Sequence, residues 1–212
     1  MKKIMFNDNY GLTKAVIEGG KTMTRRVIKC PRAFKGEWVG GFNVHIRPSD
    51  KKIVGYPCMY DADEREFDGG EILPKYKVGE VVAIAQSYKD CGNMPDFGLD
   101  EDGYPIMPMR SGFFNKMFVK SELMPYAIKI TDIRAERLQD ISNQDCLQEG
   151  IKKHISHAKV YYTHDGIGNY FFYTPRDAFA SLIDRVSGKG TWESNPFVWV
   201  YSFEVIGNPK RK

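Results

Sequence analysis

The residues best suited to chemistry lie in one short stretch near the amino terminus. The glycine pair Gly19-Gly20 ends a short helical pattern, because glycine accepts the left-handed backbone that closes a helix. The turn that follows brings cations and hydroxyls together, which suits an anion or a polar base. The same residue types also fit a plain helix cap followed by a solvated strand. The stretch reads Lys21, Thr22, Met23, Thr24, Arg25, Arg26.

Strand alternation bears on whether these side chains meet. In a regular strand from Thr22 to Ile28, Thr24 and Arg26 lie on one face, whereas Lys21 and Arg25 lie on the other. Lys21 and Thr24 therefore converge only if the backbone bends at the Gly19-Gly20-Lys21 turn.

The stretch also carries a family resemblance. Gly20-Lys21-Thr22-x-Thr24-Arg25-Arg26 resembles the G-x-K-x-x-T-x-R type motif of ASCH domains, a branch of the PUA-like superfamily. Segments 123–142, 148–151 and 195–200 are similar to the family in the same order, most of all to larger ASCH-like proteins of bacterial genomes and prophages. The chain departs from the family where Ala85-Gln86 replaces an Arg-Glu pair and where Leu123 replaces a histidine.

The resemblance implies a site. Some small relatives are amidohydrolases that remove the acetyl group of N4-acetylcytidine, and their Lys, Thr and Glu correspond to Lys21, Thr24 and Glu149 of this sequence. These three are the candidate catalytic residues. The candidate residues for binding a ligand or nucleic acid are the rest of the motif: Gly20, Thr22, Arg25, Arg26.

The chemistry is consistent with these residue types. A threonine hydroxyl becomes a nucleophile when a neighbouring base takes its proton, and Lys21 serves as that base if burial or positive neighbours lower its pKa. Arg25 and Arg26 would supply such a field or stabilise an oxyanion. Glu149 would orient the lysine, hold the amine of the base or carry protons, but an ion pair with it would raise the Lys21 pKa. A Lys21–Glu149 salt bridge that merely ties two elements together is the structural alternative.

Three functions follow from this. The first is an ASCH-type domain that recognises RNA or a modified nucleoside in a cleft lined by Lys21, Thr24 and Glu149. The second is an amidohydrolase acting on an acylated cytidine with Thr24 as nucleophile. The third is a phage-derived structural or interaction protein. No cofactor is expected, and the partner expected is RNA or a nucleoside.

The whole chain limits these functions. Its 212 residues, 42% hydrophobic, 27% charged and with a net charge of +4, are typical of a globular protein and permit a nucleic-acid partner. The four cysteines form no C-x-x-C pair, so we expect reduced thiols in a cytoplasmic protein with no membrane segment. His154 and His157 have no supporting ligand pattern, so we expect no metal site.

The pattern of elements predicts the fold. Mixed short strands with few helices predict an α+β protein, and the resemblance implies a small PUA-like mixed or antiparallel β-barrel with flanking helices. We expect one domain, residues 1–212, with insertions at about 36–76, 90–120 and 152–173. Residues 36–47 and 52–60 form a predicted hairpin, followed by a surface loop over 61–71.

Local signals predict the carboxyl-terminal half. Ser142 and Thr174 are predicted to cap helices, and the aromatic row of a final strand over 196–206 is expected in the core. Residues 152–173 are expected to form a hairpin or elaborate loop around Asp165-Gly166. In the 90–120 insertion the aromatic residues Phe113, Phe114 and Phe118 are expected to pack down.

Overall fold

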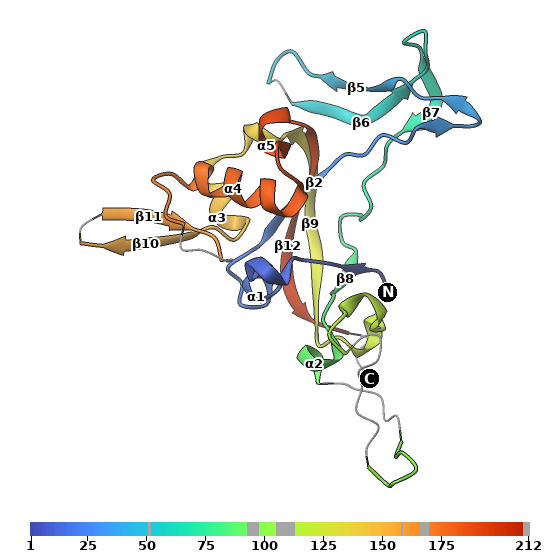
Figure 1. Ribbon diagram of the computed structural model, residues 1–212. Helices are drawn as coiled ribbons and strands as arrows, with labels where there is room; N and C mark the ends of the chain where they lie inside the picture. Colours follow the sequence, from blue (N-terminus) through green and yellow to red (C-terminus); the bar gives the residue numbers. More distant parts are fainter. Residues whose placement is uncertain (51, 93–97, 105–112, 158, 166–169, 210–212) are drawn as a thin grey trace.

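A five-stranded sheet forms the centre of the molecule (Figure 1). The computed structural model describes residues 1–50, 52–92, 98–104, 113–157, 159–165 and 170–209. In the sheet β1 and β8 are parallel and every other pairing is antiparallel. The strand order is β1 (Lys3–Ile4), β8 (Val81–Ile84), β9 (Tyr126–Arg137), β12 (Phe197–Gly207) and β2 (Met23–Val27).

The two longest strands, β9 and β12, form the centre of this sheet. They pair along their full lengths, from Phe197 opposite Arg137 to Gly207 opposite Tyr126, with one register shift after Ser202. The predicted aromatic row is confirmed as core, because Trp199, Tyr201 and Phe203 are all buried. The intervening valines of β12 are buried as well, so the strand is covered on both faces.

Most of the helices lie on one side of the sheet, and the short helix Tyr88–Cys91 lies at its lower end (Figure 1). The predicted caps are confirmed: the Ser142 hydroxyl accepts from the Asp145 N–H at 3.0 Å, and the Thr174 hydroxyl from the Asp177 N–H at 3.1 Å. The helices are α1 (Leu12–Ile17), α2 (Tyr88–Cys91), α3 (Asn143–Gln148), α4 (Pro175–Ser187) and α5 (Thr191–Ser194). Single-turn 3-10 helices lie at Asp8–Tyr10, Lys116–Phe118, Ser121–Leu123 and Leu138–Asp140.

The α+β class is observed, but no closed barrel is found among the described residues. The two edge strands β1 and β2 are not paired by backbone hydrogen bonds. Instead, the Arg26 Nη2 on β2 donates to the carbonyl of Met5, just beyond β1, at 2.6 Å. The physical reason is the shortness of β1, because the Asp8–Tyr10 3-10 helix takes the chain out of the sheet soon after Ile4.

A second sheet lies at one end of the molecule (Figure 1). The predicted hairpin is confirmed as β5 (Gly41–Ile46) and β6 (Ile53–Tyr60). The predicted loop over 61–71 is wrong, because Glu66–Glu71 forms a third strand, β7, paired with β6. The Asp61 carboxylate accepts from the Asp63 and Arg65 N–H groups, which tightens the turn and returns the chain into the sheet. A small hairpin precedes it, β3 (Ala33–Phe34) with β4 (Glu37–Trp38).

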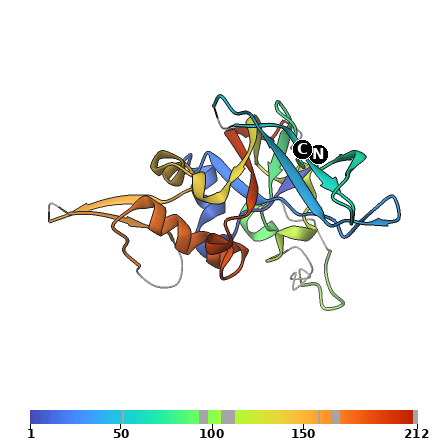
Figure 2. The same ribbon diagram turned by 90° about the horizontal axis from the view of Figure 1, so that it is seen from above.

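A separate hairpin projects from the body of the molecule (Figure 2). It consists of β10 (Lys152–Ser156) and β11 (Lys159–Thr163). The predicted hairpin within 152–173 is present, but its reversal lies just after Ser156, which pairs with Lys159. A second antiparallel bridge joins Tyr162 to Phe172, on either side of the predicted Asp165-Gly166 turn. Asp165 forms an ion pair with Lys152 at 2.6 Å, and Gly166 lies outside the described residues.

The described part of the 90–120 insertion does not pack as predicted. Phe114 and Phe118 are exposed, and Phe113 packs edge-on against Phe114 with ring centroids 4.7 Å apart. Residues 93–97 and 105–112 of the same insertion lie outside the described residues. None of the described helices combines the length and the apolar character that a membrane crossing requires.

The core predicts a clear stability contrast between two leucines. Leu138 is fully buried at the end of β9, whereas Leu73 is 61% exposed. Leu138→Ala should lower the free energy of unfolding by about 2–5 kcal/mol, because it leaves a cavity in a packed core. Leu73→Ala should change it by less than about 0.5 kcal/mol. Urea unfolding followed by circular dichroism measures both, and equal losses would contradict this description of the core.

Candidate functional site

The turn before β2 sets the position of Lys21. The Gly19 backbone is left-handed, with φ of 77°, and the Lys21 N–H donates back to the carbonyl of Ala15 at 2.9 Å. Lys21 is therefore held by the end of α1, outside the regular strand that begins at Met23. This is the bend that the sequence required if Lys21 and Thr24 were to face one space.

The end of α3 brings Glu149 to the same place. The Lys21 Nζ donates to Glu149 Oε2 at 2.5 Å and to the Glu149 carbonyl at 2.8 Å. Gly150, with φ of 101°, turns the chain away immediately afterwards and packs against the Lys21 side chain. The two side chains are almost completely buried, at 2% and 5% exposed, so the ion pair is shielded from water.

Burial also changes the acid–base behaviour of the lysine. Desolvation lowers the pKa of Lys21 from its usual value, and the Glu149 carboxylate opposes this shift only in part. The neighbouring guanidinium groups of Arg26 and Arg25 lower the pKa further. The neutral amine of Lys21 is therefore accessible at a lower pH than for a solvated lysine.

Lys21, Thr24 and Glu149 line one cavity of about 900 Å³. Its volume lies within the range of small-molecule sites. One wall is the apolar face of α4, with Phe179, Leu182, Ile183 and Val186, and the opposite wall is formed by β2 and residues 5–9. The cavity thus combines a flat apolar surface with a few convergent polar groups.

Thr24 offers the free polar group of this cavity. Its residue is 4% exposed, yet no hydrogen bond joins its hydroxyl to another of the described residues. The Lys21 ammonium makes two hydrogen bonds to Glu149 and has a third N–H left. A molecule in the cavity would find an uncommitted hydroxyl beside a lysine donor and a carboxylate.

Arg25 does not face a ligand with a free guanidinium, as its candidate binding role required. Its side chain is fully buried and donates to three carboxylates, one from β9 and two from α3 and its carboxyl-terminal cap. The distances are 2.6 Å to Glu136 Oε1, 2.7 Å to Asp145 Oδ2 and 3.2 Å to Glu149 Oε1. Arg25 is thus an electrostatic link between β2, β9 and α3, and it positions Glu149.

The other candidate residues occupy different places. Arg26 lines the cavity with its guanidinium 5.8 Å from the centre of the Phe6 ring. Thr22 lies outside the cavity lining and joins β2 to its neighbours, since its N–H donates to the Gln148 carbonyl and its carbonyl accepts from the Phe203 N–H. Gly20 also lies outside the lining and is exposed at the turn.

Two cavity residues were not found from the sequence. Phe6 presents its ring 6.0 Å from the Lys21 Nζ. Lys116, from the 90–120 insertion, reaches the rim, where its Nζ donates to the Phe6 carbonyl and to Asp8 Oδ1. No local pattern marks either residue, because each reaches the cavity only through tertiary packing.

The histidines form no metal centre in the described part of the chain. No group of three or more His, Cys, Asp or Glu residues there could hold a metal ion. His154 bonds to Thr163 on the neighbouring strand, and His164 bonds to Ser181 on α4.

Comparison of the chain with protein-family models, curated proteins and solved structures gives no match.

The Arg25 link predicts a large loss of stability when its charge is removed. Arg25→Met would leave Glu136, Asp145 and Glu149 without their shared cation, and breaking a buried pair costs about 3–5 kcal/mol. Thermal and urea unfolding should both register this loss. Arg47→Met is the matched control, because Arg47 is 54% exposed and pairs with Asp50 at 3.5 Å, so its stability should stay close to wild type. Equal stability of the two variants would show that the network is not structural.

Proposed function

We propose that the cavity binds a nucleobase, presented as a modified nucleoside or within RNA. The observation that carries the proposal is the arrangement of Lys21, Thr24 and Glu149 on one cavity beside an aromatic ring and an apolar helix face. A base is planar and apolar on its faces and carries hydrogen-bonding groups on its edge. The α4 face and Phe6 suit the faces of the base, and the polar trio suits its edge.

The hydrogen-bonding capacity of the trio supports a base that carries both donors and acceptors. Glu149 accepts from Lys21 and Arg25, which leaves carboxylate lone pairs for an N–H or amino group of the ligand. The third N–H of Lys21 suits a ring nitrogen or carbonyl. The Thr24 hydroxyl serves either role. An isolated anion would accept hydrogen bonds from Lys21 and Thr24 but would be repelled by the Glu149 carboxylate, so this set of groups favours a base over a simple phosphate.

Thr24→Val tests this proposal, since it keeps the shape of the side chain and removes the hydroxyl. Isothermal titration of wild-type protein with N4-acetylcytidine and with cytidine should show binding of at least one of them. Loss of one hydrogen bond should weaken that binding by about 2–10-fold, corresponding to about 0.5–1.5 kcal/mol. Thr22→Val is the matched control and should bind as wild type. If wild-type protein binds neither nucleoside, or if both variants lose affinity equally, the cavity does not hold a base.

A second candidate function, hydrolysis of the acyl group, is favoured by two observations at the same site. The Thr24 hydroxyl makes no hydrogen bond to a described residue, and burial lowers the pKa of Lys21. Neutral Lys21 would take the hydroxyl proton as Thr24 Oγ1 attacks the acyl carbon. The proton would then pass to the departing amine of the base, and water would hydrolyse the acyl-threonine.

Hydrolysis has its own measurement. Cytidine released from N4-acetylcytidine is followed by chromatography across a pH series. The rate should rise with pH as Lys21 loses its proton and level off above its lowered pKa, at a lower pH than that at which a solvated lysine titrates. Thr24→Val should abolish the release. Nucleoside binding without release would assign the cavity to recognition alone.

A further inference from the structure

A second hollow adjoins the cavity. It has a volume of about 800 Å³ and shares four lining residues with the cavity: Met5, Arg26, Val27 and Lys29. We call it the basic groove. Its other side is formed by residues 72–76, on the connection from β7 to β8, and by Trp199 and Tyr201 of β12.

The charge of the basic groove is of one sign. Its lining includes five cationic side chains and no carboxylate: Lys2, Lys3, Arg26, Lys29, Lys75. Lys2 is paired with Glu80 at 3.0 Å. The other four form no ion pair with any described residue, so their field is directed at whatever occupies the groove.

The hydrogen bonds of Lys3 and Arg26 are to neutral carbonyls, although the Glu122 carboxylate acts electrostatically on Lys3 from outside the groove. The Lys3 Nζ donates to the carbonyls of Met117 and Val119 at 2.7 Å, and Arg26 donates to the carbonyl of Met5. Neutral carbonyls fix the position of the two cations without cancelling their charge. Lys29 and Lys75 are exposed and free to move onto an anion.

The floor of the basic groove has little capacity to read a base. Tyr76, Trp199 and Tyr201 are buried beneath it. The Tyr76 hydroxyl donates to the Lys3 carbonyl, and the Tyr201 hydroxyl accepts from the Lys75 N–H, both at 3.0 Å. The groove therefore offers positive charge rather than base-specific hydrogen bonds, which suits the phosphodiester backbone.

We propose that the basic groove binds the backbone phosphates of a single-stranded polynucleotide while one of its bases occupies the adjoining cavity. This inference rests on the proposed function of the cavity and names the class of its ligand. A strand is favoured over a lone nucleoside, because a nucleoside carries no phosphate to occupy the groove. A single strand is favoured over a duplex, because an unpaired base enters a cavity without the cost of unstacking and unpairing.

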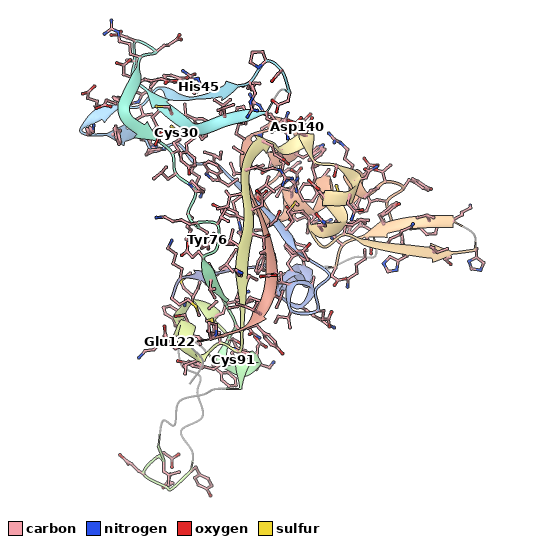
Figure 3. The ribbon with its side chains drawn as sticks, turned by 180° about the vertical axis from the view of Figure 1, so that it is seen from behind. Cys30, His45, Tyr76, Cys91, Glu122 and Asp140 are labelled. Atoms are coloured by element: carbon pink, nitrogen blue, oxygen red, sulfur yellow. The ribbon has the colours of Figure 1, made fainter. Side chains whose placement is uncertain are left out.

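A second cationic surface provides the matched control. Lys153 and Lys159 are exposed on the β10–β11 hairpin. That hairpin projects on the side of the central sheet opposite to Tyr76 (Figure 3). Removing these two lysines changes the net charge by the same amount as removing Lys29 and Lys75, but leaves the groove intact.

Fluorescence anisotropy with a labelled single-stranded oligocytidylate of about eight nucleotides tests the inference. Each phosphate contact on a single strand contributes about 0.7 to the slope of log affinity against log salt concentration. The double variant Lys29→Ala/Lys75→Ala should flatten the slope by about 1.4 and weaken binding on the order of 25-fold at about 0.1 M salt. Lys153→Ala/Lys159→Ala should bind as wild type. Both pairs are exposed, so folding is not at issue.

The outcomes separate the groove from the cavity. Tight binding of either the ribose or the deoxyribose oligonucleotide supports a phosphodiester ligand, and their ratio identifies the sugar. The single variant Lys75→Ala, whose side chain lines the groove but not the cavity, should bind the free nucleoside as wild type does, whereas Thr24→Val should weaken that binding. Nucleoside binding with no tighter binding of the strand would overturn the groove and spare the cavity. The groove proposal would also be overturned if cytidine 5′-monophosphate bound as tightly as the strand. The same holds if the hairpin variant lost as much affinity for the strand as the groove variant.

Discussion

The pairing of buried charges is the constraint on which the rest of this structure depends. Lys21 and Arg25 are buried cations, and a buried charge is tolerated only when it is paired and hydrogen-bonded. Their carboxylate partners are Glu136 on β9, Asp145 in α3 and Glu149 at the end of α3. Each partner comes from a different turn or element, so satisfying the charges fixes the position of α3 against the sheet. The location of Glu149 at the cavity is thus a consequence of electrostatics as much as of packing.

The same network explains which groups remain for a ligand. Arg134 adds a further cation, with bonds of 2.9 Å to Glu136 and to Asp145, so these two carboxylates are shared between two guanidinium groups. Glu149 is shared between Arg25 and Lys21. The groups left over are one N–H of Lys21, lone pairs of Glu149 and the hydroxyl of Thr24. A densely satisfied network around a few unsatisfied groups is the arrangement that preorganises a site, because the supporting bonds hold the free groups in place.

Local sequence signals predicted the features that depend on a few neighbouring residues. The caps at Ser142 and Thr174 and the buried aromatic row of β12 are of this kind. Barrel closure depends on strands distant in the chain, and no closed barrel is found among the described residues. The reversal just after Ser156 was not predicted, because no Gly, Pro, Asn or Asp marks residues 156–159. Lys21 and Glu149 are 128 residues apart, and only a motif resemblance, not spacing, placed them together. The residue type of Arg25 fits both an anion site and a buried ion network, so the sequence alone did not reveal the network that its three carboxylate partners form.

The distribution of charge matters more here than its sum. A net charge of +4 over 212 residues is a weak argument for a polyanionic partner. Yet Glu136, Asp145 and Glu149 direct their negative charge inward, where buried cations neutralise it. The cations of the basic groove have no such counterpart except Glu80 at Lys2. Because the acids of the network are paired internally, the basic groove keeps a local excess of positive charge. Arg26 lines both this groove and the cavity. An anionic strand attracted to that excess would lie next to the cavity that we propose as the site of a base.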